Sequence, residues 1–206
     1  MTTRSLSDLL DDLKASTLGE EVTLKTLLEA FHERGFGFFL LLFALPAALP
    51  VPAIGLNAII ALPLLILTAQ QAIGRHTIWL PESWLAKSVS KNKIDGYIDT
   101  ANPWVKKIET LIRPRLPFIT QGLSSNMIGI LGFFMALAVS IPLPLTNTVP
   151  SIGIVCMAIG VIMRDGLAVI IGILIGIGWI VLLSWLIIFF GSEAIDLVKT
   201  TIKGFV

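Results

Sequence analysis

Two Pro-x-Pro sequences interrupt the apolar blocks of this chain, and they are its most chemically suggestive feature. A proline removes a backbone donor and clashes with the preceding helical turn. Backbone groups freed in this way cannot face lipid, so they are buried in protein or line a wet cavity. Matched interrupted segments are typical of substrate sites in secondary transporters. We therefore predict a substrate or ion path that includes Pro50, Pro52, Asn57, Gln70, Gln71, Pro142, Pro144, Asn147, Arg164 and Asp165.

Each of these residues also has a simpler interpretation. The prolines could merely shape tight turns between two short spans, and Gln70 and Gln71 could be hydrated amides at the membrane interface. Asp165 directly precedes a long apolar run, so we favour it as a helix N-cap, with Arg164 extending its charge to the surface. A proton-coupling carboxylate is the alternative role for Asp165, because ionisable residues at membrane depth are commonly functional.

The other polar residues predict no catalytic or metal site. The sequence has no phosphate-binding glycine loop and no nucleophile elbow. Its single cysteine, Cys156, lies in an apolar run and is read as a packing residue. Glu109 and Arg113 are four residues apart, which predicts an ion pair on one helix. We expect no enzymatic activity, no cofactor and no metal.

Composition indicates an integral membrane protein. The chain has 206 residues, of which 55% are hydrophobic and 14% charged, whereas soluble domains carry about a quarter charged residues. Its mean hydropathy is +0.87. The apolar residues form two blocks, 36–73 and 127–190, and residues 1–34 show no cleavable signal peptide. We expect the apolar blocks themselves to act as insertion signals.

Before its break the first block is too short for a simple span, whereas residues 54–73 after the break are long enough, although Pro63 lies within them. About 14 residues precede Pro50, and a helix of that length covers about 21 Å, against a hydrocarbon core of about 30 Å. The block is either a re-entrant hairpin of two half-helices or two tightly joined spans. The second block ends in a run of about 25 apolar residues, long enough for a full span. Within it, Gly172 and Gly176 are spaced for close helix packing.

The two blocks have the same plan. A displacement of 92 positions, the difference between residues 37 and 129, aligns them without gaps. This register matches Gly37 with Gly129, Pro50 with Pro142, Pro52 with Pro144 and Gly74 with Gly166. The matched prolines and glycines predict an internal duplication, and the relative orientation of its halves stays open.

The predicted fold is an all-α integral membrane protein with two internal repeats. Each repeat contains a proline-broken, re-entrant-like helical hairpin, and a long transmembrane helix follows near the C-terminus. The central loop is basic and rich in tryptophan, which suits contact with lipid headgroups on the cytoplasmic side, and Asn102-Pro103 within it predicts a helix start. The segments are 1–34 (amphipathic, cytoplasmic), 35–74 (repeat 1), 75–126 (interfacial loop), 127–190 (repeat 2 with the long span) and 191–206 (tail).

Short motifs in a characteristic order resemble the ExoD family of bacterial membrane proteins. They are Arg34-Gly35-Phe36-Gly37, Pro50-Val51-Pro52, Trp79-Leu80-Pro81, Arg113-Pro114-Arg115, Pro142-Leu143-Pro144 and Arg164-Asp165-Gly166. Ala53 departs from the pattern, in which a glycine follows the first Pro-x-Pro. The resemblance implies a multi-pass protein of the bacterial inner membrane linked to exopolysaccharide synthesis. It brings no established reaction and no catalytic residues.

Two functions are consistent with this reading. The first is a small oligomeric transporter or channel for an ion or small solute, with its path at the paired Pro-x-Pro breaks. The second is a non-transporting accessory or scaffold protein of exopolysaccharide assembly. The expected partners are membrane lipids, further copies of the chain and exopolysaccharide-assembly proteins; no nucleic acid is expected.

Overall fold

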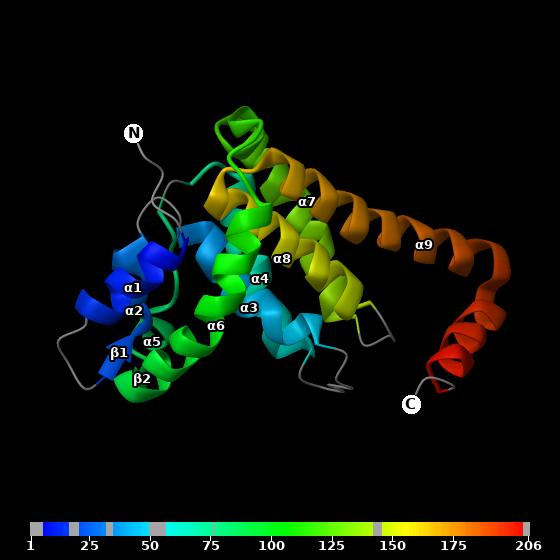
Figure 1. Cartoon of the computed structure of the whole chain (residues 1–206). Coiled ribbons are helices and arrows are strands. Elements are labelled where there is room, and N and C mark those ends of the chain that lie inside the picture. The colour runs from blue at the N-terminus through cyan, green and yellow to red at the C-terminus, as the bar shows by residue number, and fades with distance from the viewer. Residues whose placement is uncertain are drawn as a thin grey trace.

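Helices dominate the chain, as Figure 1 shows. The structure is a computed structural model that describes residues 6–16, 21–31, 35–49, 57–75, 77–141 and 146–203. Its elements in chain order are α1 (Leu6–Ser16), β1 (Glu21–Thr23), α2 (Leu24–Phe31), α3 (Gly35–Ala48), α4 (Asn57–Ala72), α5 (Glu82–Leu85), β2 (Ser88–Ser90), α6 (Lys91–Leu111), η2 (Pro117–Thr120), α7 (Leu123–Ser140), α8 (Thr148–Met163) and α9 (Gly166–Lys203).

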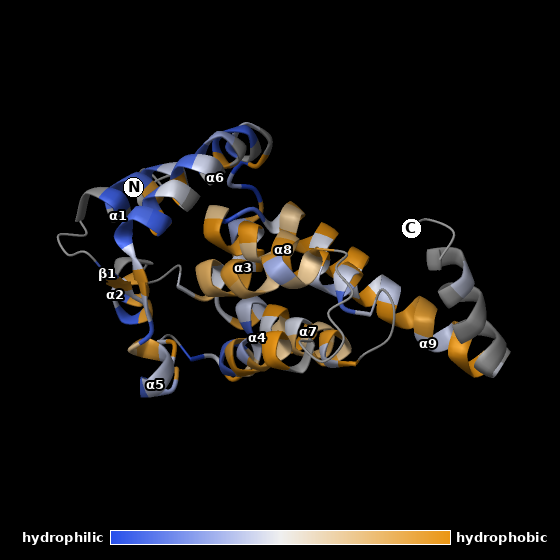
Figure 2. Cartoon of the chain, turned by 90° about the horizontal axis from the view of Figure 1, so that it is seen from below, coloured by the Kyte–Doolittle hydropathy of each residue, from blue (hydrophilic) through white to orange (hydrophobic). Residues whose placement is uncertain are grey.

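Among the described residues, two helices are long and apolar enough to cross a membrane: α7 and the first part of α9, residues 166–189. Three apolar helices are shorter, at residues 35–48, 59–72 and 148–163. In Figure 2 the hydrophobic colour concentrates on these helices, whereas α1 and α6 are largely hydrophilic. The apolar blocks of the sequence therefore form a group of helices with polar helices to one side.

Helices α3, α4, α7 and α8 form a four-helix unit in which the closest pairs are not consecutive in sequence. α4 packs most closely against α7, and α3 against α8. Side chains from all four helices fill the core, which is apolar because each helix presents a broad aliphatic face. The large side chains that are fully buried here are Phe39, Leu40, Leu64, Leu67, Met135, Ile154, Met157 and Ile162.

Two glycines allow the closest approach within these pairs. A Cβ added at Gly129 of α7 would collide with the backbone of Gln71 and Ala72, at the end of α4. A Cβ added at Gly37 of α3 would lie 2.7 Å from Ile162 Cγ1 and 3.0 Å from the Ala158 carbonyl oxygen, near the end of α8. Each contact joins the start of one helix to the end of its partner, so both pairs are antiparallel.

The antiparallel pairing shows which helix ends lie together at each end of the unit. α4 and α8 end where α3 and α7 begin. At the opposite end, Ala47 of α3, Ala61 of α4 and Val139 of α7 form a small apolar cluster. The helix ends that flank both Pro-x-Pro sequences lie there, while Pro50, Pro52, Pro142 and Pro144 themselves fall outside the described residues.

α9 packs against the unit only through its first turns. Gly172 and Gly176 lie against Gly153 of α8, whose added Cβ would be 2.7 Å from the Gly172 carbonyl oxygen. Farther along, α9 extends away from the unit (Figure 1) and bends at Gly191, where φ is 53° and ψ is −130°. Large apolar side chains on this extension are exposed: Val181, Leu182, Trp185, Ile188 and Phe189.

The N-terminal helices and α6 form a polar layer, together with a short antiparallel sheet. The sheet pairs Val22 with Val89, so an all-α fold was not fully correct; Val22 is buried and anchors the first strand. Lys14 donates to Asp99 at 2.6 Å, and this hydrogen bond raises the pKa of the lysine. Ser7 donates through its backbone N–H and hydroxyl to the two carboxylate oxygens of Glu109, at 2.8 and 2.7 Å.

Two local predictions for α6 were wrong. The helix begins at Lys91, not at Asn102, and includes Pro103 in its interior. It ends at Leu111, so Arg113 lies beyond it and the expected same-helix pair with Glu109 does not form. Glu109 instead binds the first turn of α1, where a carboxylate is favoured by the helix dipole.

Replacing Gly129 with alanine should destabilise the protein, because the new methyl group meets the backbone of α4 rather than a movable side chain. We expect a loss of about 1–3 kcal/mol, typical of an overpacked core. The matched control is Gly178→Ala in α9, where an added Cβ meets nothing within 4 Å. Thermal unfolding of the detergent-purified variants, followed by circular dichroism, measures the difference. Equal unfolding temperatures for the two variants would contradict the close approach.

Candidate functional site

A polar pocket of ≈ 640 Å³ lies at the end of the four-helix unit where α4 and α8 end and α7 begins. Its wall comes from three parts of the chain: the end of α4, the segment from η2 into α7, and the end of α8. The residues that line it are Gln71, Gly74, Arg75, Thr120, Gln121, Gly122, Ser125, Asn126, Val161 and Arg164. They include two arginines and no acidic residue, so the lining is cationic.

Both arginines follow helix ends of the same type. After α4, Arg75 N–H donates to the Gln70 carbonyl at 3.0 Å, and Gly74 is left-handed with φ 74°. After α8, Asp165 N–H donates to the Gly160 carbonyl at 2.8 Å, and Arg164 is the left-handed residue with φ 56°. These are Schellman-type ends, which usually use glycine. Positive charge is favoured at such helix C-termini.

The structural match between the two halves differs here from the sequence register. The register pairs Gly74 with Gly166, but the left-handed residue after α8 is Arg164. Gly166 instead begins α9 and packs against η2, where an added Cβ would lie 2.8 Å from the Leu116 carbonyl oxygen. Of the two matched glycine pairs, Gly37 and Gly129 therefore have similar surroundings in the two halves, and Gly74 and Gly166 do not.

Gln71 is a buried member of the pocket wall, with only 3% of its surface exposed. Its Nε2 donates to Ser125 Oγ at 3.3 Å, which joins α4 to the first turn of α7. Its Oε1 accepts no hydrogen bond from the described residues. A buried amide oxygen without a donor is costly, so this atom favours a ligand that brings a hydroxyl or N–H group.

Gln70, its neighbour, has a different role. Its Oε1 accepts from Trp79 N–H at 2.6 Å, and its Nε2 donates to the Trp79 carbonyl at 2.8 Å and the Ile66 carbonyl at 3.1 Å. The side chain thus supplies hydrogen-bond partners to the backbone of Trp79 and holds the segment after α4 in place. It does not line the pocket.

Asp165 is buried and bound by backbone N–H groups from two elements. Its Oδ1 accepts from Leu167 at 2.9 Å and Ala168 at 3.4 Å, which caps the start of α9. Its Oδ2 accepts from Arg113 N–H at 3.2 Å, which holds the chain that leaves α6. The carboxylate thus connects the end of α8, the start of α9 and the segment before η2.

Among the remaining predicted site residues, Asn147 lies away from the pocket. Asn147 occupies the N-cap position of α8 without a side-chain capping bond, at the opposite end of the unit. Asn57 begins α4, but its side chain lies outside the described part of the chain, as do the prolines. The structure therefore brings Gln71 and Arg164 together and separates them from Asn147.

Sequence reasoning missed Arg75, Gln121, Ser125 and Asn126. The missed signal is a polar run, residues 120–126, directly before the second apolar block. A polar run at this place predicts an interface position but not a pocket, because the pocket requires α4 to end beside it. The cation set and the amide and hydroxyl groups together suit an anionic, hydroxyl-bearing ligand, since guanidinium groups bind phosphate and carboxylate in a bidentate manner.

The fold defines a mostly helical protein with two helices long enough to cross a membrane. The chain matches the family described as "Exopolysaccharide synthesis, ExoD" over residues 6–185, and it belongs to this family.

Two relatives show the same similarity. The protein ExoD of Rhizobium meliloti is 32% identical over 170 residues, which cover 81% of this chain and 70% of that protein. An uncharacterized protein of Synechocystis sp. is 35% identical over 150 residues, which cover 72% of this chain and 71% of that protein. No solved structure matches the chain.

Replacing Asp165 with alanine should lower the stability of the protein, because the first turn of α9 loses its cap. We expect a loss of about 1–2 kcal/mol, the usual cost of removing a capping oxygen. Asp165→Asn keeps an acceptor and should lose less, since asparagine caps helices about as well as aspartate. Denaturation of both variants in detergent measures this order. An Asp165→Asn variant as unstable as Asp165→Ala would show that the charge or the Oδ2 bond to Arg113 N–H, not the cap, is what matters.

Proposed function

We propose that this chain serves exopolysaccharide synthesis as a multi-pass protein of the bacterial inner membrane that binds and moves a small anionic solute. Family membership supports the process, and the two candidate spans support the membrane placement. The observation that carries the proposal is the pocket, which combines two arginines with amide and hydroxyl groups at the end of the helices. Membrane anchoring alone does not require a polar pocket of this kind.

We propose further that α3–α4 and α7–α8 are two copies of one hairpin. Exchanging the copies turns the α4–α7 pair into the α8–α3 pair, and these are the closest pairs in the unit. Gly37 and Gly129 make equivalent close contacts in the two pairs. Because both Pro-x-Pro sequences join helix ends at the same end of the unit, the copies are parallel rather than inverted.

A path would have to run between copies of the chain. The core of the four-helix unit is closed by large apolar side chains, among them Phe39, Met135 and Met157. The exposed apolar extension of α9 offers surface on which a second copy could pack. We therefore propose a homo-oligomer in which the pocket of each copy opens toward a shared path, with no enzymatic step.

The closed core also favours the second candidate function. A chain without an internal path could act as a scaffold that holds exopolysaccharide-assembly proteins at the membrane. In that case the exposed charged face of α6 would be a natural contact for them. The pocket would then stabilise or sense a ligand without moving it.

Liposomes containing the purified full chain test the transport proposal. We expect flux of at least one small anion, such as phosphate, acetate or chloride, above that of protein-free liposomes. The double variant Arg75→Gln with Arg164→Gln should reduce the flux at least about tenfold, because a charge-assisted hydrogen bond contributes about 1.5–3 kcal/mol. The matched control is Lys106→Gln, which removes an exposed charge from α6 away from the pocket.

Liposomes that stay tight to every tested anion and cation would overturn the transport proposal. Flux that Lys106→Gln reduces as strongly as the arginine variants would remove the pocket from the path. Tight liposomes, together with co-purification of a polysaccharide synthase or polymerase with the chain from cell membranes, would support the scaffold function instead.

A further inference from the structure

The ligand of the pocket can be specified more closely from the residues in and around it. We propose that the pocket takes the headgroup of a phosphate-bearing lipid, a phosphate ester with free hydroxyl groups whose chains lie along the apolar surface beside the pocket. The inference rests on the proposed function in one respect, since it names the ligand of the same pocket. It does not require that the ligand be moved.

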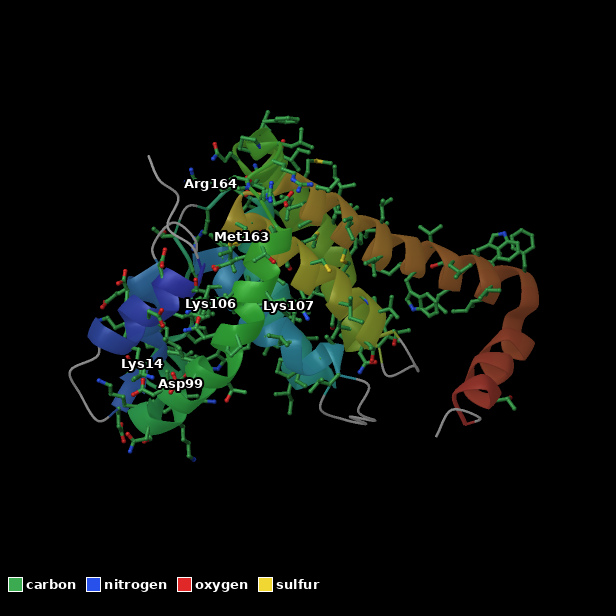
Figure 3. All side chains as sticks on the ribbon, in the orientation of Figure 1. Lys14, Asp99, Lys106, Lys107, Met163 and Arg164 are labelled. Carbon is green, nitrogen blue, oxygen red and sulfur yellow. The ribbon has the colours of Figure 1, made fainter. Side chains whose placement is uncertain are left out.

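The charge of the pocket fits a phosphate. Arg75 comes from the chain after α4 and Arg164 from the turn after α8, so the two arginines reach the wall from different elements. Figure 3 places Arg164 at that turn, next to Met163 at the end of α8. The nearest acid in sequence, Asp165, is not among the lining residues and uses both carboxylate oxygens to accept backbone N–H groups. It is therefore committed to the fold at α9.

The start of α7 adds to this anion preference. Its N-cap residue is Gly122, which supplies no side-chain hydrogen bond to the first turn. Ser125 and Asn126 of that turn line the pocket. Helix N-termini bind phosphate through their backbone N–H groups and the helix dipole. The arginines thus present positive charge to the cavity, and the start of α7 adds its helix dipole and the polar side chains of Ser125 and Asn126, since Ser125 N–H already donates to the Gly122 carbonyl at 3.0 Å.

The polar wall favours a ligand that also donates a hydrogen bond. Gln71 lines the pocket, and its Oε1 is buried and accepts no hydrogen bond from the described residues. An anion without hydrogen to donate would leave it unsatisfied. A glycerol or sugar hydroxyl on the phosphate ester would donate to this oxygen, while the phosphate binds the arginines.

The surroundings of the pocket fit a lipid rather than a soluble phosphate ester. Large apolar side chains flank the lining residues in sequence and are well exposed: Ile73 (72%), Phe118 (66%), Leu123 (85%) and Met127 (55%). Ile73 directly follows α4, Phe118 lies in η2, and Leu123 and Met127 lie at the start of α7. Lining residues of the polar wall come from the same segments. Leu123 is also the first residue of a helix long enough to span a membrane. The polar wall therefore suits the headgroup of an amphiphile, and these four apolar side chains, here called the apolar rim, suit its acyl chains.

Binding to the full chain, purified in an uncharged detergent, tests the proposal. The probes are dihexanoyl phosphatidylglycerol, dihexanoyl phosphatidic acid, dihexanoyl phosphatidylcholine, glycerol 3-phosphate and inorganic phosphate. Tryptophan fluorescence follows each titration, since Trp79 is bound to Gln70 next to the pocket and is 58% exposed. We expect phosphatidylglycerol to bind at least about tenfold more tightly than phosphatidylcholine, glycerol 3-phosphate or inorganic phosphate.

Substitutions separate the parts of the site. Arg75→Gln with Arg164→Gln should weaken phosphatidylglycerol binding at least about tenfold, whereas Lys106→Gln on α6 should leave it unchanged; Figure 3 labels Lys106 on that helix. Gln71→Leu has a similar volume and removes the acceptor, together with the Nε2 bond to Ser125. It should abolish the preference for phosphatidylglycerol over phosphatidic acid, about three- to tenfold for one hydrogen bond. Thermal unfolding of each variant checks that it remains folded.

Three results would overturn the lipid assignment. Glycerol 3-phosphate binding as tightly as phosphatidylglycerol would make the ligand a soluble phosphate ester. Equal binding of phosphatidylcholine would show only general lipid contact with the apolar rim. Arginine variants that are folded and bind normally would remove the pocket as the site. Anion flux that persists without lipid binding overturns this inference alone, while lipid binding without flux overturns only the transport proposal.

Discussion

The close approach of α4 to α7 is the contact on which the pocket depends. It requires a residue without a side chain at Gly129, because the backbone of Gln71 and Ala72 occupies the space that a Cβ would need. This contact sets the end of α4 beside the start of α7 and brings Gln71 within hydrogen-bonding distance of Ser125. Gly37 lets α8 approach α3 through contacts with Ile162 and the Ala158 carbonyl, and Arg164, which lines the pocket, follows the end of α8. One steric constraint, used twice, thus positions both halves of the wall.

The apolar helices were predictable from local sequence because hydropathy and helix breakers are local properties. The two blocks, their breaks and the long run after Asp165 correspond to α3, α4, α7, α8 and the first part of α9. The pairing of these helices was not predictable, since the exchange of partners between the halves depends on contacts between residues far apart in sequence. Pro103 was misread as a helix start because proline is also tolerated within a longer helix that neighbouring packing supports.

Neighbouring residues with similar chemistry proved to have different tasks, which sequence alone does not separate. Gln70 and Gln71 were predicted together, but successive helical residues point about 100° apart. Gln70 satisfies the backbone at Trp79, and Gln71 lines the pocket. Arg164 and Asp165 divide in the same way, because the left-handed residue at 164 turns the chain between them. The Arg164 side chain is part of the pocket wall, and the Asp165 side chain caps α9.

With the proposed membrane placement, the shortness of the helices would give the pocket its access to lipid. α3, α4 and α8 contain 14, 16 and 16 residues, which correspond to about 21–24 Å at 1.5 Å per residue. A hydrocarbon core is about 30 Å thick, and short spans are accommodated by local thinning of the bilayer. With the proposed membrane placement, thinning draws headgroups toward the ends of these helices, where Arg75 and Arg164 follow α4 and α8. The segment of α9 from 166 to 189 has 24 residues, which is long enough to span a bilayer of normal thickness. The bilayer would therefore have its normal thickness outside the four-helix unit. The unit would therefore hold a thinned patch of membrane at its own end, and phosphate groups would reach the arginines without leaving the bilayer surface.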